Sequence, residues 1–94
     1  MQIISISHRG LKRLIEDNNP RELSANMVPR IRRIVTALVL AEEPETILGP
    51  PGWRIHQLTG DRAGTWSISV TGNWRMTFRF VGDGVVDLNL EDYH

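Results

Sequence analysis

The sequence predicts an α+β fold in which two N-terminal helices pack on one face of a twisted, mainly antiparallel sheet. Residues 64–80 alternate apolar and polar side chains on either side of Gly72-Asn73, which is typical of a β-hairpin. Residues 28–41 repeat apolar side chains at three- and four-residue spacing, which is typical of an amphipathic helix. Because helical patterns precede a run of strand patterns, the element order β-α-α-β-β-β-β favours an α+β sandwich.

The first predicted elements are short. Residues 2–6 form an apolar strand, and a helix follows from His8 to about Asp17 with Ser7 as its N-cap. The turn residues Asn18-Asn19-Pro20 end this helix.

The start of the second helix depends on Pro29. Either Ser24 or Asn26 can cap the helix. We favour Asn26, because Pro29 then lies in the first turn, where its missing N–H costs little. The segment Glu42-Glu43-Pro44 ends the helix. After a proline-containing loop, a strand is predicted over residues 53–58.

The register of the first hairpin follows from its apolar face. A three-residue loop over 71–73 sets Val70 opposite Trp74 and Ile68 opposite Met76, whereas a two-residue turn mixes polar and apolar side chains. We therefore predict the longer loop, with Asn73 in the left-handed conformation.

A second hairpin is predicted around Gly82-Asp83-Gly84, with Gly84 left-handed and a last strand over about 85–90. The register that keeps its core face apolar also sets opposite charges side by side. Each such pair is worth only about 0.2–1 kcal/mol, but the charge pairs and the apolar face agree on one register, which supports it. The predicted pairs are Phe78 with Leu88, Arg79 with Asp87, and Arg75 with Glu91.

Composition narrows the class of protein. A chain of 94 residues that is 40% hydrophobic predicts one domain over 1–94 with a modest core. The absence of cysteine excludes disulfides and thiol chemistry. No apolar run approaches the roughly 20 residues that span a bilayer, and the first residues are too polar for a secretory signal. We therefore expect a cytoplasmic protein without a membrane partner.

Charge is distributed unevenly although the net charge is zero. Seven basic and three acidic residues precede Glu42, whereas four basic and eight acidic residues lie from Glu42 onward. This asymmetry fits an anionic partner on the N-terminal half, and it fits a solvated helix surface equally well.

The polar face of the predicted sheet is where a site is expected. Two histidines and an arginine could cleave RNA through its own 2′-hydroxyl: one group removes the hydroxyl proton, a cation steadies the phosphorus centre, and an acid protonates the departing oxygen. Histidine suits both proton transfers, and no metal is needed because the nucleophile belongs to the substrate. The residues of this face, with the chain end, are Arg54, His56, Ser67, Ser69, Arg75, Thr77, Arg79, Asp87, Glu91 and Asp92-Tyr93-His94.

Other readings of the same residues stay open. The arginines could serve only in their cross-strand pairs, His56 could be an ordinary surface residue, and His94 could be inert at the chain end. A metal site of His56, Asp92 and His94 is conceivable, although the spacing carries no metal signature.

Several segments resemble the HigB-type toxins, also called plasmid maintenance system killer proteins, of the RelE/ParE superfamily. The resemblance covers essentially the whole chain. The segments are 52–58, Gly60-Asp61, Trp66-Ser67-Ile68, 72–80 and Glu91-Asp92-Tyr93-His94, with Arg32-Arg33-Ile34 and Gly10-Leu11-Lys12.

The resemblance implies a RelE/ParE-like microbial RNase-type fold and a toxin of a bacterial type II toxin–antitoxin system. Such toxins enter the ribosomal A site and cut the translated mRNA without a metal or other cofactor. The implied partners are a helix-turn-helix antitoxin of the HigA type, the ribosome with its mRNA, and operator DNA through the antitoxin complex. By position, the implied catalytic residues are His56, Asp92, Tyr93 and His94, with Arg75 as a basic residue of the site.

One departure from the family pattern concerns Thr59, where a lysine is usual. Its loss could lower activity, or shift the role of the cation to Arg54, Arg62 or Arg75. The basic residues expected to contact RNA or the ribosome are Arg54, Arg62, Arg79, Arg9, Lys12, Arg13 and Arg33.

Two alternative functions remain from the sequence. One is a toxin that acts by binding, as in the gyrase-inhibiting branch of the superfamily, although the Asp92-Tyr93-His94 terminus argues against it. The other is a weakened toxin that serves mainly as an antitoxin-bound co-repressor, which Thr59 leaves open. The sequence does not assign acid and base between His56 and His94.

Overall fold

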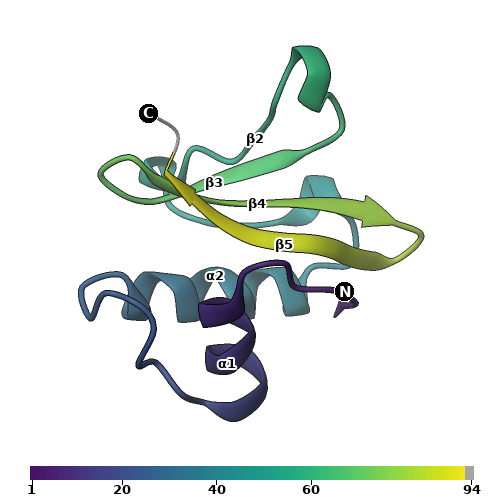
Figure 1. Ribbon diagram of the computed structural model, residues 1–94. Coiled ribbons are helices and arrows are strands. Elements are labelled where there is room, and N and C mark those ends of the chain that lie inside the picture. The colour runs from purple at the N-terminus through teal and green to yellow at the C-terminus, as the bar shows by residue number, and fades with distance from the viewer. Residues whose placement is uncertain (93–94) are drawn as a thin grey trace.

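The computed structural model describes residues 1–92. Within them, two helices lie on the same side of a five-stranded sheet (Figure 1), in the strand order β1-β5-β4-β3-β2. β1 runs parallel to β5, and every other neighbouring pair is antiparallel. The predicted α+β class and element order are confirmed. The elements are β1 Gln2–Ile3, α1 Arg9–Asp17, α2 Val28–Leu40, β2 His56–Gln57, β3 Trp66–Thr71, β4 Trp74–Val81 and β5 Gly84–Asp92.

The core lies between the helices and the sheet. α2 buries its three- and four-spaced residues, and β3 and β4 bury their alternate apolar residues, as the two periodicities predict, although Ser67 and Thr77 of the other face are buried too. Both helices therefore cover the apolar face and leave the other face of the sheet for polar side chains. Among the fully buried side chains are Leu11, Ile31, Ile34, Leu38, Ile68, Val70, Met76, Phe78, Val85 and Leu88.

Both helix starts lie one residue later than predicted. The N-cap of α1 is His8, not Ser7, and Nδ1 of His8 accepts a hydrogen bond from the backbone N–H of Leu11 at 3.2 Å. Desolvation lowers the pKa of His8, against a smaller raising effect of Glu22. The N-cap of α2 is Met27, not Asn26, and Pro29 lies in the first turn as predicted.

The first hairpin combines the two registers that the sequence offered. Ile68 lies opposite Met76 as predicted, but Thr71 lies opposite Trp74, so the turn has two residues and the three-residue loop is wrong. A register shift between Ser69 and Thr71 reconciles the two pairings. The left-handed residue is Gly72, with φ 56°, and not Asn73. Two-residue turns match the twist of the strands, and one bulge restores the apolar face.

The second hairpin also has a two-residue turn and a register shift. Val81 lies opposite Gly84, and Gly82 has φ 61°, so the predicted left-handed Gly84 is wrong. The predicted pairing of Arg75 with Glu91 is confirmed. A register shift between Thr77 and Arg79 places Arg79 opposite Val86 and not opposite Asp87 as predicted. Phe78, which was predicted opposite Leu88, lies within this shift.

The two short edge strands are shorter than predicted. β1 ends at Ile3, followed by an isolated parallel bridge from Ile6 to Leu88. The segment Pro51–Trp53 forms a 3-10 turn that delays β2 until His56, because the N–H groups of Trp53 and Arg54 donate to the carbonyls of Pro50 and Pro51 within the turn. Further 3-10 turns cover Pro44–Thr46 (η1) and Gly60–Arg62 (η3). None of the helices in residues 1–92 has the length and apolar character needed to cross a membrane.

Candidate active site

The uncovered face of the sheet carries polar residues in two rows that cross the strands. The register aligns the first row, and the second row lies two residues away from it on β3, β4 and β5. This confirms the predicted polar face for these positions, and Asn89, which was not predicted, lies on it as well. The first row is His56, Ser67, Thr77 and Asn89, and the second is Ser69, Arg75 and Glu91.

A hollow of about 110 Å³ opens on this face at the β2 edge. Three of the predicted site residues line it together, from the end of the Pro51–Trp53 turn, from β2 and from β4, along with two serines of β3. The lining residues are Arg54, His56, Ser67, Ser69 and Arg75. The fold therefore brings one histidine and two arginines to a single small cavity.

The ring of His56 is oriented by the residue two positions before it. Its Nδ1 is hydrogen-bonded to the backbone carbonyl oxygen of Arg54. A carbonyl oxygen can only accept, so Nδ1 carries the proton and Nε2 of the neutral ring is an acceptor. Arg54 has φ 51°, a left-handed conformation that costs a non-glycine residue about 1–2 kcal/mol. Such strain is retained where the surroundings fix it, often at functional sites.

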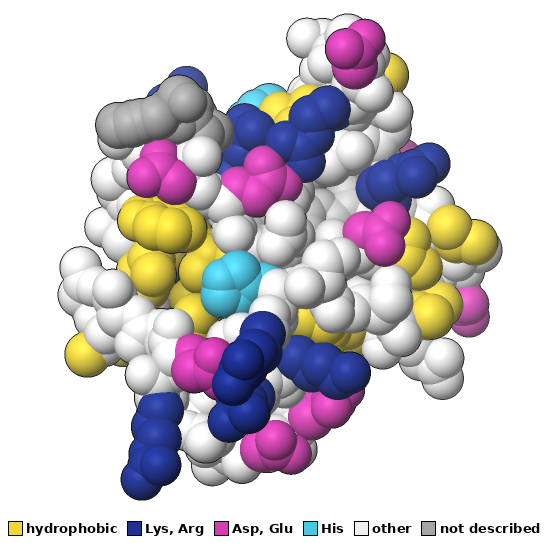
Figure 2. Space-filling model, viewed as in Figure 1, with side chains coloured by type: hydrophobic (Ala, Val, Ile, Leu, Met, Phe, Trp, Pro, Cys, Tyr) yellow, Lys and Arg dark blue, Asp and Glu magenta, His cyan; other side chains and the backbone are white. Residues whose placement is uncertain are grey.

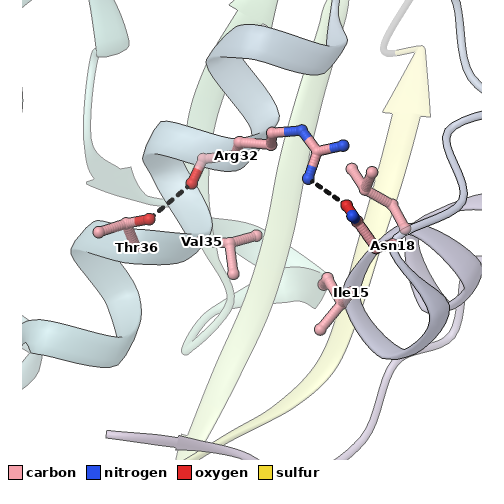
Figure 3. A pocket seen from close by; sticks show the side chains of 6 residues that line it. Ile15, Asn18, Arg32, Val35 and Thr36 are labelled. Carbon is pink, nitrogen blue, oxygen red and sulfur yellow. Dashed lines mark hydrogen bonds between the residues drawn. The ribbon is translucent and has the colours of Figure 1, made fainter.

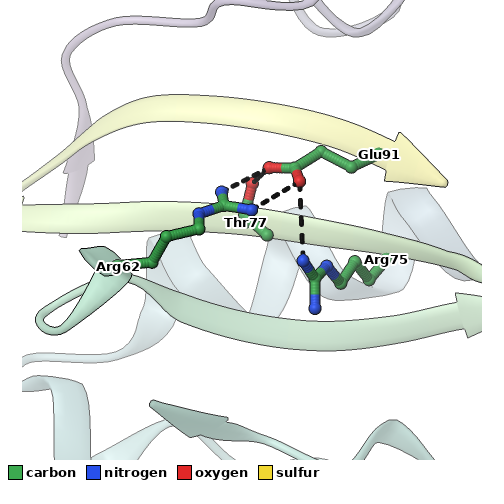
Figure 4. A network of polar contacts seen from close by, with 4 residues as sticks. All are labelled: Arg62, Arg75, Thr77 and Glu91. Atoms are coloured by element: carbon green, nitrogen blue, oxygen red, sulfur yellow. Dashed lines mark hydrogen bonds and ion pairs between the residues drawn. The ribbon is translucent and has the colours of Figure 1, made fainter. Parts of the chain in front are cut away.

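Glu91 is the centre of a polar network beside the hollow (Figure 4). Arg62 of η3 donates to both carboxylate oxygens, from Nη1 to Oε1 at 2.7 Å and from Nη2 to Oε2 at 2.6 Å. The hydroxyl of Thr77 donates to Oε2, and Nη2 of Arg75 lies 3.6 Å from Oε1. Arg62 contributes most to lowering the pKa of Glu91 to about 2, with help from Thr77 and Arg75 and against burial.

A second hollow of about 190 Å³ lies on the same face and is lined in part by Glu91. It contains Arg62 and Arg79, two residues that the sequence assigned to RNA contacts, but it also contains the carboxylates of Asp87 and Glu91. The other lining residues are Ser7, Thr65, Thr77, Phe78 and Asn89.

The predicted catalytic residues at the chain end are only partly described. Asp92 lies opposite Trp74 and has an exposed side chain. It is not among the described residues that line the two hollows. Tyr93 and His94 lie outside the described residues, so their roles and the His56–Asp92–His94 metal site stay predictions. Thr59 is exposed and is the N-cap of η3.

The basic residues of the helices do not converge on the hollows. Arg9 and Arg13 of α1 share Glu22, with N–O distances of 3.2 and 2.7 Å, and Lys12 is exposed. Figure 2 shows basic side chains gathered in two places on this side of the molecule, over the sheet and over the region of α1. Arg33 of α2 instead lines a groove of about 400 Å³ whose other residues are mostly apolar.

Another open hollow of about 400 Å³ lies between the helices (Figure 3). Arg32 crosses its rim and donates to Oδ1 of Asn18 at 2.8 Å, while Ile15 and Val35 supply an apolar wall. Its lining contains no histidine and no carboxylate, so the polar face remains the candidate site.

Comparison with known proteins identifies the family. A family model described as "RelE-like toxin of type II toxin-antitoxin system HigB" matches residues 4–94. The chain belongs to this family of HigB-like toxins. The toxin is 41% identical over 92 residues to "Endoribonuclease HigB" of Proteus vulgaris, covering 98% of this chain and 99% of the relative. The family resemblance stated from the sequence is therefore confirmed.

Solved structures confirm the RelE-type fold of the toxin. A point mutant of YafQ from E. coli superposes with a TM-score of 0.64 at 14% identity, covering 99% of this chain and 94% of that one. The YafQ of the E. coli DinJ-YafQ complex superposes with a TM-score of 0.56 at 12% identity, with the same coverage. As one half of a toxin–antitoxin system, the toxin has an antitoxin as its partner.

The site also contains residues to which sequence reasoning gave no role. Ser67, Ser69 and Thr77 were placed on the polar face by alternation, but nothing marked them as lining a cavity. The contact of Arg62 with Glu91 was missed, because it joins a turn to a strand 29 positions later and no local pattern reports it.

Proposed function

We propose that this toxin is a ribosome-dependent, metal-independent mRNA endonuclease that inhibits translation by cleaving in the A site through the 2′-hydroxyl of the substrate. The observation that carries the proposal is the hollow shared by Arg54, His56 and Arg75, with the His56 ring oriented by a backbone carbonyl. The name of the Proteus vulgaris relative supports ribonuclease chemistry.

His56 suits the role of general base. The neutral ring carries its proton on Nδ1, so Nε2 can accept the proton of the 2′-hydroxyl. The resulting alkoxide attacks the adjacent phosphorus, the bond to the 5′-oxygen breaks, and a 2′,3′-cyclic phosphate forms. His94 is the proposed acid that protonates the departing 5′-oxygen, with Asp92 and Tyr93 as its proposed partners at the chain end.

Arg75 is the proposed cation for the phosphorus centre. Its side chain is only 17% exposed and lines the hollow that contains His56. A charge fixed in a site with little water stabilises developing negative charge more strongly than one in bulk solvent. With threonine at position 59, Arg54 and Arg75 are the basic residues of this hollow, and Glu91 pairs more closely with Arg62 than with Arg75.

The proposed partners follow from this chemistry. A HigA-type helix-turn-helix antitoxin would neutralise the toxin and link it to operator DNA, and the ribosome would present the mRNA in the cytoplasm. We assign Arg79 to RNA near the hollows. Arg9, Lys12, Arg13 and Arg33 are assigned to the ribosomal surface, where salt-sensitive phosphate contacts are expected.

A cell-free bacterial translation reaction tests the proposal. Purified toxin is added with and without ribosomes, and mRNA 5′ ends are mapped for the wild type, His56→Ala and Gln57→Ala. Gln57 is the matched control, since it is exposed on the same strand and does not line the hollow. Ribosome-dependent, in-frame cuts that disappear only with His56→Ala are expected. Intact mRNA with the wild-type toxin refutes the proposal.

A further inference from the structure

We propose that Glu91 is a positioning residue for the cleavage reaction: together with Arg62 and Thr77, it fixes the guanidinium of Arg75 at the hollow that contains His56. This inference rests on the proposed function. It assigns a role in the reaction to a carboxylate that would otherwise only repel an RNA phosphate.

The geometry around Glu91 joins three elements of the fold. The carboxylate is on β5, Arg62 comes from η3, and Thr77 and Arg75 come from β4. Both carboxylate oxygens are engaged by Arg62 in a two-pronged pairing, which fixes the plane of the group as well as its position. Thr77 is buried, with 2% of its surface exposed, and its hydroxyl donates to Oε2.

The two arginines contact Glu91 differently. Arg62 binds at 2.6–2.7 Å, at or just below the short end of the range of charge-assisted hydrogen bonds, whereas Nη2 of Arg75 lies 3.6 Å away. Arg62 therefore satisfies the carboxylate, and Glu91 restrains Arg75 without binding it as tightly. Arginine side chains have many rotamers, so an arginine that is already restrained loses less entropy when it meets the substrate.

Charge supports the same division of roles. Two guanidinium groups and one carboxylate leave this network with a net positive charge, so a phosphate approaching the hollow meets attraction. Arg62 thus neutralises the charge of the Glu91 carboxylate, which would otherwise repel an RNA phosphate. In this arrangement Arg62 acts through Glu91, and this role is distinct from a direct contact to RNA.

A double-mutant cycle on programmed ribosomes tests the inference. Single-turnover cleavage rates and half-saturating toxin concentrations are measured for the wild type, Glu91→Gln, Arg75→Ala and the double variant, with Glu45→Gln as the charge-removal control. Glu45 is exposed in η1 and lines neither hollow. Thermal unfolding of every variant establishes that it is folded at the assay temperature.

Glu91→Gln is expected to lower the cleavage rate at least about tenfold with little change in half-saturation, since the lost interaction acts in the chemical step. If Glu91 acts through Arg75, then Glu91→Gln changes the rate of the Arg75→Ala variant by less than about twofold. A merely structural role would lower stability and leave both rates unchanged.

The outcomes separate the two proposals. Wild-type toxin that leaves mRNA intact overturns the proposed function together with this inference. Wild-type cleavage with an unchanged rate for Glu91→Gln, or with equal effects of Glu91→Gln in both backgrounds, overturns the inference alone. Should Glu91→Gln be unfolded, Thr77→Val takes its place in the same cycle, because it removes the hydroxyl donor and keeps the carboxylate.

Discussion

The Glu91 network makes the stability of this toxin depend on acidity. The pKa of Glu91 is held near 2, against an ordinary 4.5, first by the hydrogen bonds from Arg62. A carboxyl whose folded pKa is depressed stabilises the fold above its unfolded pKa. We therefore expect the contribution of Glu91 to the free energy of unfolding to be fully present above about pH 5 and to be lost as the pH falls from about 4.5 to 2.

The size of this contribution can be bounded from the structure. A shift from 4.5 to about 2 corresponds to at most about 3–4 kcal/mol, at about 1.36 kcal/mol for each pH unit. Solvent reduces that figure, because the side chains of Arg62 and Glu91 are 43% and 20% exposed. We expect about 1–2 kcal/mol of unfolding free energy after this screening.

Urea unfolding of the wild type and of Glu91→Gln at several pH values between about 7 and 2 measures the contribution directly. The two proteins should differ by about 1–2 kcal/mol at neutral pH and converge near the folded pKa of Glu91. Glu45→Gln, which removes an exposed carboxylate, should follow the wild type at every pH. A constant difference between wild type and Glu91→Gln over the whole range would show that the carboxylate charge has no part in stabilising the network.

Three further predictions follow from individual residues. His56→Ala should lower the rate of mRNA cleavage by about 10²–10⁴ with unchanged thermal stability, and a rate within about threefold of wild type would remove His56 from the chemistry. His8→Ala should lower the free energy of unfolding in urea by about 1 kcal/mol, because the acceptor for the Leu11 N–H is lost. His8→Asn keeps an acceptor and should lower it less, and equal losses for the two variants would contradict a capping role of His8. Gly49→Ala would press a Cβ into the Trp53 ring, so the melting temperature should fall by an amount equivalent to about 1–3 kcal/mol, while Gly52→Ala, which meets nothing within 4 Å, should be close to neutral.

The sequence predicted the parts of the fold that depend on local periodicity. The helix cores, the element order and the central pairings of the first hairpin were correct, because burial of an apolar face leaves few alternatives. The turns were wrong for a common reason. Alternation alone cannot distinguish a three-residue loop from a two-residue turn followed by a bulge, since both keep Ile68 opposite Met76.

The candidate site was less predictable, because some of its contacts join residues that are far apart in the sequence. The polar row on the sheet followed from alternation, and the pairing of Arg75 with Glu91 followed from the register that keeps the core face apolar. The capping role of His8 was missed because Ser7 is the better N-cap by residue type, whereas in the structure Nδ1 of His8 accepts from Leu11 and the backbone N–H of Ser7 donates to Leu88 of β5. The attachment of Arg62 to Glu91 depends on where η3 folds, which is a tertiary property.

The position of β5 in the sheet has a consequence for how the chain folds. β5 comes after every other described element, yet it lies between β1 and β4, and Ser5 accepts a hydrogen bond from the backbone of Asp87, 82 residues away. Contacts of such large sequence separation incur the full entropy of loop closure before they contribute, so they form late. The β3–β4 hairpin can assemble locally and early. Because β1 borders the sheet only at β5, it cannot join the sheet until β5 has docked, so we expect the pairing of β1 with β5 to be a late folding step.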